Sequence, residues 1–296
     1  MLSILNNQNT CSVVVTFHPD PALPDRLSPI TRQVDRLLIV DNGSGNSVDT
    51  IFDTLASDTR IEIIRNKENL GLAAALNQGI RWAGEHGYQW VLTMDQDSLA
   101  YDSMLSGLAD AYCAAQNSRN IAVIGANYVD RSTSIPFFSP TGLEKPWNDA
   151  KTVITSGSLV SLEAVEAIGS FRDDLFIDHV DDEFCLRARS KGFGVIITSE
   201  VFMEHVIGAP TKEIFFCKSL FTTNAPAARR YYQTRNLLVI AKEYFSADSG
   251  WVFNALKVRL KELILMLMFE NNKLDKLWKT ALGAFDALRG RMGRID

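Results

Sequence analysis

Asp95 and Asp97 stand one residue apart at the end of an apolar run, within the segment V-L-T-M-D-Q-D-S at residues 91–98. The run at residues 90–94 is typical of a buried strand. Where such a strand ends, carboxylates at positions i and i+2 can turn toward one hard divalent cation and leave coordination positions for phosphate oxygens. The pattern predicts a metal and diphosphate site, although Asp-x-Asp also occurs in turns and at helix N-caps.

A second group of acids, Asp178, Asp181, Asp182 and Glu183, lies further along the chain. The residues after it have the pattern of a helix that ends near a glycine C-cap at Gly192. Acids at a helix start complement the helix dipole and cap exposed amides, which is the simpler explanation for Asp178 and Asp182. The alternative is a carboxylate that takes part in catalysis.

Short apolar runs rich in β-branched residues recur through the first half, at residues 12–17, 36–40, 61–65, 90–94 and 121–124. Segments that could form helices separate them, so the sequence predicts an α/β fold with a parallel sheet and ligands at the carboxyl ends of the strands. Polar residues follow four of these runs: Thr16, Asp41, Asn42, Gly43, Ser44, Asn66, Asn69, Asp95 and Asp97. We expect these strand ends to converge on one crevice.

The usual nucleotide-binding signatures are absent. Gly43 and Gly45 begin a G-x-G-x-x-G pattern, but Val48 takes the place of the third glycine, and the sequence has no Gly-Lys pair for a phosphate loop. This disfavours dinucleotide enzymes and phosphate-loop hydrolases.

Two other features suit a nucleotide. Asp41 ends a predicted strand, where it could accept hydrogen bonds from a base or ribose. Asn69-Leu70-Gly71 should open a helix whose N-terminus attracts anions, although a simple N-cap explains Asn69 equally well.

Four segments in order, V-V-V-T-F-H-P-D, L-L-I-V-D-N-G-S, N-K-E-N-L-G-L-A-A-A-L-N-Q-G-I and V-L-T-M-D-Q-D-S, resemble the nucleotide-sugar half of family 2 glycosyltransferases. The D-Q-D-S form and the T-F-H-P-D turn, where relatives more often carry T-Y-N-P-D, resemble the rhamnosyltransferase-like subgroup. His18 departs from the commoner pattern and has no assigned role. The resemblance implies a Rossmann-like glycosyltransferase A fold with a mixed central sheet, and an inverting, metal-dependent sugar transfer.

The resemblance also implies roles for individual residues. The expected donor-binding residues are Thr16, Phe17, Asp41, Asn69, Gly71, Asn77, Asp95, Gln96 and Arg235. Gly157, Ser158 and Glu183 are expected on the acceptor side. Asp95, Asp97 and His205 are expected to bind Mn²⁺ or Mg²⁺, of which Mn²⁺ tolerates a nitrogen ligand better. From its position alone, His205 at the end of an apolar run is more simply a satisfied polar residue.

The family's E-D-x-D-L-x-x-R pattern, anchored here at Arg187, places the general base at Asp181, with Asp182 as the second candidate. Val180 stands where the pattern has its preceding acid. In an inverting transfer the acceptor hydroxyl loses its proton as it attacks, which requires a base, and the departing diphosphate requires a cation. Asp181 meets the first requirement, and Asp95 with Asp97 meets the second.

The middle of the chain is less regular. Residues 132–150 contain three prolines and a glycine, which predicts a loop or short hairpin on the acceptor side. Residues 153–160 are expected to form a strand interrupted at Gly157, either beside the sugar or as a simple β-bulge.

The segment R-R-Y-Y-Q-T-R-N at residues 229–236 also resembles the family, and predicts that Arg235 and Asn236 lie near the active site. The alternative is a helix whose tyrosines face the core and whose arginines are solvated.

We expect a catalytic domain at residues 1–245, with a nucleotide-sugar half at about 1–130 and an acceptor half at about 131–245, followed by a helical extension at 246–296. The apolar run at 263–269 is too short to span a bilayer, which needs about 20 residues. The extension could pack on the domain, form a homodimer, or lie in a membrane interface with its tryptophans and basic residues near lipid headgroups.

Composition sets outer limits. The chain has 296 residues and a net charge of -5, which disfavours nucleic acid as a partner. The scattered cysteines Cys11, Cys113, Cys185 and Cys217, and an N-terminus without a signal-peptide pattern, predict a cytoplasmic protein with reduced thiols.

The favoured function is transfer of rhamnose from deoxythymidine diphosphate (dTDP)-rhamnose to a saccharide acceptor, expected to be lipid-linked, for a cell-surface polysaccharide such as O-antigen. A uridine diphosphate (UDP) hexose or galactofuranose donor is one alternative. A non-catalytic scaffold that binds a nucleotide sugar is another, which the presence of Asp95, Asp97, Asp181 and His205 disfavours.

Overall fold

The computed structural model describes residues 5–117, 119–131, 134–139, 145–206, 211–215 and 218–295. The chain divides into two compact units, one formed by Met1–Asp173 and Val180–His205 and the other by Asp174–His179 and Val206–Asp296. The boundary that we expected after residue 245 does not coincide with this division. Helix α7 (Ala227–Tyr244) packs closely against α9 (Lys273–Arg289), so it belongs with the C-terminal helices.

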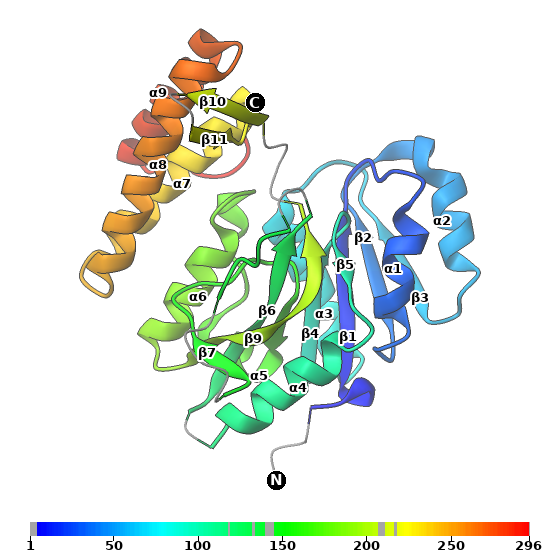
Figure 1. Cartoon of the computed structure of the whole chain (residues 1–296). Helices are drawn as coiled ribbons and strands as arrows, with labels where there is room; N and C mark the ends of the chain where they lie inside the picture. Colours follow the sequence, from blue (N-terminus) through cyan, green and yellow to red (C-terminus); the bar gives the residue numbers. More distant parts are fainter. Residues whose placement is uncertain are drawn as a thin grey trace. The chain divides into compact units, whose positions relative to one another are not determined.

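Unit 1 is built on a nine-stranded mixed sheet (Figure 1). Its strands are β1 (Thr10–Thr16), β2 (Leu37–Asp41), β3 (Ile61–Arg65), β4 (Trp90–Asp95), β5 (Leu99–Ala100), β6 (Ile121–Asp130), β7 (Trp147–Asp149), β8 (Ser158–Ser161) and β9 (Gly194–His205). The order is β3-β2-β1-β4-β8-β6-β9-β5, with β7 paired to β9. Strands β3, β2, β1 and β4 are parallel, and β8 runs antiparallel to both β4 and β6. The mixed sheet that we expected is therefore present.

The helices of unit 1 are α1 (Leu23–Thr31), α2 (Asp49–Ala56), α3 (Leu72–Glu85), α4 (Met104–Ala115), α5 (Leu162–Ile168) and α6 (Val180–Ser190). Short 3-10 turns occur at Asn7–Asn9, Gly45–Val48 and Asp173–Leu175. Alternate residues of the parallel strands face opposite layers, as the period of two requires. Val14 packs in the larger core with residues of α1, α2 and α4, whereas Val13 packs with residues of α3.

The five predicted strands of the first half are confirmed, and β6 extends beyond its predicted end to Asp130. The strand predicted at residues 153–160 is shorter, because it starts only at Ser158. Gly157 has a φ of 75°, and a Cβ there would lie 2.4 Å from the Met203 sulfur. Residues 153–157 precede β8 as irregular backbone with a turn at Ser156 and Gly157, where the positive φ favours glycine. In the irregular segment, residues 132–133 and 140–144 lie outside the described part of the chain.

Unit 2 contains α7, α8 (Ser249–Phe269) and α9, with a hairpin of β10 (Thr211–Phe215) and β11 (Lys218–Thr222). The helix expected at residues 251–269 is present as α8. The interior of unit 2 is unusually polar, because five charged residues are buried there: Arg230, Arg235, Glu270, Lys276 and Asp286. Glu270 joins Arg230 and Lys276 through hydrogen bonds of 2.8 Å each.

In the described part of the chain, every helix is too short or too polar to cross a bilayer. Cys11, Cys113 and Cys185 are free thiols, and Cys217 lies outside the described residues.

Candidate active site

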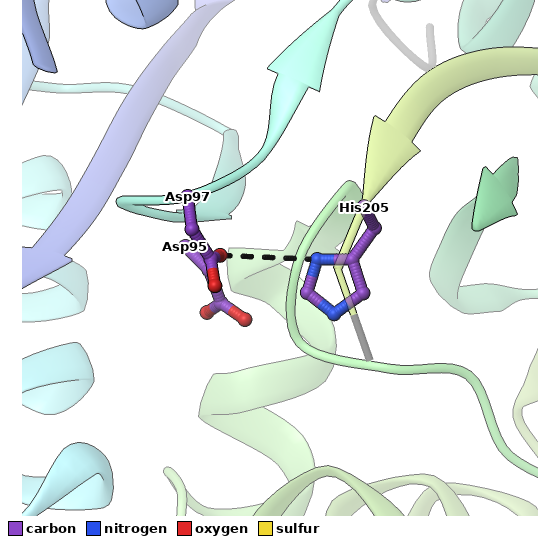
Figure 2. A group of neighbouring side chains, drawn as sticks. All are labelled: Asp95, Asp97 and His205. Carbon is purple, nitrogen blue, oxygen red and sulfur yellow. Dashed lines mark ion pairs between the residues drawn. The ribbon is translucent and has the colours of Figure 1, made fainter. Parts of the chain in front are cut away.

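Asp95, Asp97 and His205 meet at one point of unit 1, with their side chains directed toward one another (Figure 2). One potential ligand atom from each residue lies within 4.8 Å of the other two. The Asp97 carboxylate and His205 Nδ1 are 3.9 Å apart. The metal-binding group predicted from the sequence is therefore assembled in space.

Strands β4 and β9 bring these residues together from distant parts of the chain. Ser98, which directly follows Asp97, is 107 positions from His205. Asp95 is the last residue of β4 and His205 the last residue of β9. The short strand β5 follows the D-Q-D-S turn and pairs antiparallel with β9, placing Leu99 opposite Glu204. This pairing holds the turn that carries Asp97 beside the end of β9.

Two buried serines connect the cluster. The Asp95 N–H donates to Ser156 Oγ at 3.1 Å, and Ser156 Oγ donates to Ser98 Oγ at 2.7 Å. Ser98 Oγ in turn lies 2.8 Å from His205 Nδ1. Sequence reasoning assigned no role to Ser98 or Ser156. Their position next to acids and glycine was the only available signal, and serine at such positions usually belongs to a turn.

Ser98 can orient the His205 ring. Donor and acceptor in the contact between Ser98 Oγ and His205 Nδ1 depend on the tautomer, and the ring nitrogen without a proton keeps its lone pair for a metal. Burial lowers the pKa of His205 below its ordinary value, while the nearby Asp97 opposes this shift. The net direction favours the neutral imidazole, the form that ligates a metal.

Asp181 is held at the first turn of α6. Its carboxylate accepts the Thr155 N–H and the Asp182 N–H, each at 3.0 Å. Thr155 is adjacent to Ser156, whose hydroxyl accepts from the Asp95 backbone. Residues 155 and 156 therefore join the candidate base to the candidate metal cluster.

The other acids of α6 divide into two kinds. Asp182 is half-buried beside Asp181, whereas the Glu183 side chain is only 2% exposed. Both Glu183 oxygens accept from Arg187, at 3.0 and 2.9 Å, and Arg187 also donates to the carbonyl groups of residues 168–170. Glu183 is therefore tied to Arg187 rather than open to an acceptor, contrary to our expectation.

The donor-side residues predicted at the ends of β1 and β2 are adjacent. Asp41 is completely buried, and it accepts from Thr16 Oγ1 and the Ser44 N–H, each at 3.1 Å, and from the Ser44 hydroxyl. The His18 N–H donates to Ser44 Oγ at 2.7 Å. Asp41 thus holds the loop after β2, and its contact with a base stays a prediction.

Phe17 and Gln96 lie beside each other across β1 and β4. The Phe17 N–H donates to Gln96 Oε1 at 2.8 Å, and Gln96 Nε2 donates to the Phe17 carbonyl at 3.2 Å. The Phe17 ring is 43% exposed. This exposed ring, on the residue whose backbone bonds Gln96, is available for stacking on a base or sugar.

Two asparagine side chains, Asn42 and Asn69, bond backbone groups at the start of α3. Helix α3 begins at Leu72 with Gly71 at its N-cap, so Asn69 is not the cap. Asn69 instead accepts the Gly71 N–H at 2.9 Å and the Asn42 amide at 3.1 Å. Gly71 has a φ of 92°, which a side chain would strain. Asn42 also accepts the Leu70 N–H at 3.0 Å, a role that the sequence had not singled out.

Three other predicted residues have structural contacts. Asn77 is buried and bonds Phe171 N and O and the Asp173 carboxylate, so α3 is fastened to that loop. Ser158 is buried and donates to the Ile154 carbonyl at 2.6 Å. Gly157 lies between β4 and β6, where its N–H donates to the Thr93 carbonyl and its own carbonyl accepts from the Ala126 N–H. These contacts give each residue a structural role, and their expected contacts with ligand stay predictions.

Arg235 and Asn236 belong to unit 2 and are completely buried there. Arg235 donates to the carbonyls of Asp174, Leu175 and Gly293, and its guanidinium lies over the rings of Tyr231 and Tyr232. Asn236 Nδ2 donates to the carbonyl groups of residues 175, 177 and 178 at 2.8–2.9 Å. The pair anchors the segment at 174–178. A contact of Arg235 with the donor stays a prediction.

The arrangement has the components of a metal-assisted transfer. Two carboxylates and one imidazole suit Mn²⁺ or Mg²⁺, and the compact spacing of their ligand atoms fits one ion. A separate carboxylate, Asp181, accepts from the Thr155 N–H, whereas the neighbouring Ser156 bonds Asp95. Asp181 could accept a proton.

The sequence is similar to that of known proteins. The model of the family described as glycosyl transferase family 2 matches residues 12–168. Over 306 aligned residues, 97% of this chain and 98% of the relative, the chain is 29% identical to "dTDP-rhamnosyl transferase RfbF" of Shigella flexneri.

Solved structures share the fold. The chain superposes on Staphylococcus aureus TarS 1-349 in complex with UDP-GlcNAc with a TM-score of 0.61, 13% identity, and coverage of 96% of this chain and 82% of TarS. It superposes on the mannosyltransferase PcManGT from Pyrobaculum calidifontis, in complex with GDP-Man and Mn²⁺, with a TM-score of 0.57 and 16% identity. That match covers 95% of this chain and 74% of PcManGT. The expected glycosyltransferase A fold is confirmed.

Proposed function

Because the chain belongs to glycosyl transferase family 2, we propose that it transfers rhamnose from dTDP-rhamnose to a saccharide acceptor with inversion at the anomeric carbon. The observation that carries this proposal is the assembly of Asp95, Asp97 and His205 beside Asp181, linked through residues 155–156. The nature of the sugar rests on the similarity to the dTDP-rhamnosyl transferase along nearly the whole chain.

The transfer is a single displacement. The acceptor hydroxyl oxygen forms a bond to the anomeric carbon while the bond from that carbon to the diphosphate oxygen breaks. The hydroxyl proton passes to the Asp181 carboxylate, and dTDP leaves with the bonding electrons. Asp181 is suited to this step because two backbone N–H groups hold its carboxylate in place at the first turn of α6.

Asp95, Asp97 and His205 would hold the divalent cation, Mn²⁺ or Mg²⁺. When bound, such a cation neutralises the charge that develops on the departing diphosphate. The Phe17 ring and the Gln96 side chain lie at the same edge of the sheet and would contact the donor. Thr16, Asp41, Asn69 and Gly71 support the loops around it, and Asp182 is the second candidate for the base.

We propose that the acceptor is a growing saccharide carried on a lipid, as in the synthesis of a cell-surface polysaccharide such as O-antigen. The protein would then act in the cytoplasm against the inner face of the membrane.

The test is a thermal-shift panel of nucleotide sugars with Mn²⁺, with Mg²⁺ and with chelator. A ligand that binds only the folded protein raises Tm by mass action. A metal-dependent rise with dTDP-rhamnose is expected, followed by release of dTDP once an acceptor is added.

Other outcomes would select the alternatives. A rise with a UDP-hexose or UDP-galactofuranose instead would keep the mechanism and overturn the donor. Donor binding without any transfer to saccharide acceptors, including lipid-linked ones, would support a nucleotide-sugar-binding scaffold.

A further inference from the structure

Helix α9 exposes its apolar side and buries its polar side. Its buried residues are Lys276, Gly283 and Asp286. The large apolar residues of the helix are exposed to solvent: Leu274 (85%), Leu277 (41%), Trp278 (65%), Phe285 (47%) and Leu288 (87%). Folded proteins in water normally show the reverse distribution.

The exposed residues form one continuous stripe. Leu274, Trp278, Phe285 and Leu288 follow one another at intervals of four, seven and three, which places them on one face of a helix. Apolar side chains scattered singly over a surface need no explanation, but a contiguous stripe of this kind marks an interaction site.

Specific contacts fix which side of α9 faces inward. The Tyr231 hydroxyl donates to the Asp286 carboxylate at 2.7 Å, and Lys276 Nζ donates to Glu270 at 2.8 Å. A Cβ at Gly283 would lie 2.5 Å from the Tyr231 carbonyl oxygen, so only glycine permits this close approach to α7. Rotating α9 to bury its leucines would break these contacts, and the apolar stripe therefore stays outside.

Helix α8 has a second exposed stripe, made by Phe253, Leu260, Ile264 and Leu267. Its opposite side packs in unit 2, where Arg259 donates to Gln233 and Thr234 of α7. The exposed lysines of this helix, Lys257 and Lys261, lie one turn from the apolar residues, where their stems can cover apolar surface and their ammonium groups can reach outward.

The charge around these stripes is positive in a chain that is negative overall. Residues 249–296 contain nine Lys and Arg against five Asp and Glu, whereas the rest of the chain contains 21 against 30. Among the described acids of this segment, Glu270 and Asp286 are buried and Glu262 pairs with Arg259, so Asp275 is the one exposed acid of α9. The other exposed charged residues described in this segment are basic: Lys257, Lys261, Lys273, Arg289, Arg291 and Arg294.

The same charges disfavour a second copy of the chain as the occupant. Lys273 lies at the start of α9, while Arg289 and Arg291 lie at its end. Two copies that paired through the stripe, whether parallel or antiparallel, would bring positive ends together, with Asp275 as the one exposed acid to offset them. A negatively charged surface has no such conflict.

We propose that α8 and α9 form a membrane-binding face that lies on anionic lipid, with the aromatic and aliphatic stripes in the headgroup boundary and the basic residues against lipid phosphates. The lipid-linked acceptor proposed above would make such docking useful, since both substrate and enzyme would share one surface. The structural argument nevertheless rests on unit 2 alone and does not depend on the sugar transferred.

The test is co-sedimentation with vesicles of phosphatidylcholine alone and of equimolar phosphatidylcholine and phosphatidylglycerol, without nucleotide sugar. The intact chain should sediment with the anionic vesicles and far less with the neutral ones. The double variant Leu274→Gln/Leu288→Gln should lose about ten-fold or more in vesicle partitioning. Both leucines are almost fully exposed, so the variant should keep its Tm. Ile135→Gln, which removes a 64% exposed apolar residue from unit 1, should sediment like the unaltered chain.

A second measurement locates the contact. Brominated phosphatidylcholine in the anionic vesicles should quench the fluorescence of Trp278, and Trp278→Phe should remove most of this quenching. Absence of sedimentation with anionic vesicles, or equal sedimentation of the double variant, would overturn the proposal. So would a dimer by light scattering that the double variant converts to a monomer, because the stripe would then be covered by a second copy. Each of these results is obtained without donor, so it leaves the transferase proposal to be judged separately.

Discussion

At the scale of single residues, Asp97 is the open side of the candidate metal cluster, since its side chain is 53% exposed while that of His205 is 12% exposed. Asp97→Ala should abolish the metal-dependent part of the donor-induced Tm rise and leave the Tm of the free protein unchanged, because exposed substitutions usually change stability by less than about 0.5 kcal/mol. Asp102→Ala, which removes another exposed carboxylate nearby, is the matched control. Unchanged donor affinity with and without Mn²⁺ would contradict the metal assignment.

The substitution Asp181→Asn should affect the transfer step without affecting donor binding. Asp181→Asn keeps an oxygen that can accept one of the two backbone N–H groups but removes the basic carboxylate. We expect nearly normal donor binding in the thermal-shift assay and a fall in transfer rate of about 10²–10⁴-fold, the usual contribution of a general base. Asp182→Asn should keep most activity. If the effects of the two substitutions are reversed, Asp182 is the base.

Ser98 acts through His205 rather than on the substrate. Ser98→Ala removes the hydroxyl that lies 2.8 Å from Nδ1, so the imidazole loses a hydrogen bond that orients it. Mn²⁺ affinity, measured by titration calorimetry or by electron paramagnetic resonance, should fall by about 10–100-fold.

The control for Ser98→Ala is Ser12→Ala. Ser12 is also a buried serine, and it donates to the Leu92 carbonyl at 3.0 Å. Both substitutions should lower stability by about 1 kcal/mol, the net value of one buried hydrogen bond. A purely structural role for Ser98 would be indicated by equal Mn²⁺ affinities in the two variants.

At the scale of elements, α7 supports a strained stretch of backbone at residues 176–179. Phe176, Asp178 and His179 all have φ between 62° and 66°, a conformation that costs roughly 1–3 kcal/mol for each residue. Asn236 donates three hydrogen bonds to this stretch, and Arg229 pairs with Asp178 at 3.1 Å. The strain persists because α7 holds the stretch from several sides.

Asn236→Ala should therefore lower the free energy of unfolding by about 2–3 kcal/mol, because buried carbonyl groups lose their donor. Urea denaturation measures this change, and hydrogen exchange should show faster exchange at residues 174–179. Asn254→Ala on the exposed part of α8 is the control, and it should be neutral or slightly stabilising because alanine has the higher helix propensity. Equal stability of the two variants would refute the anchoring role.

At the scale of the whole molecule, charge is unevenly distributed along the chain, with the positive C-terminal stretch opposing a negative remainder. If α8 and α9 lie on anionic lipid, vesicle binding should weaken as salt rises from 0.1 to 1 M, where the Debye length falls from about 10 to about 3 Å. Binding should not vanish, because the apolar contribution of the exposed stripes is not screened. Sedimentation across a salt series checks this. If vesicle binding did not change with salt, the basic residues would not contribute to it.

Much of the local structure follows from the sequence. The apolar runs that end at Thr16, Asp41 and Asp95 were recognisable as strands, because their periodicity and β-branched residues act locally. The spacing of Asp95 and Asp97 also indicated a candidate metal site, whereas the expectation that His205 joins them came from family resemblance. Family resemblance supplied the role of Asp181, which spacing alone left open.

What the tertiary structure decided is the partner of each polar side chain. Asn77 and Arg235 were expected to contact ligand, and each is buried against a group more than 60 positions away in the chain. Ser98 and Ser156 gained importance for the same reason, since 58 positions separate them in the chain. Glu183 is buried against Arg187, one turn away on the same helix. In α9 the periodicity defines an apolar stripe, but only its packing against α7 determines that the stripe faces outward. Local propensity fixes the elements, whereas the contacts that give a side chain its role depend on residues distant in sequence.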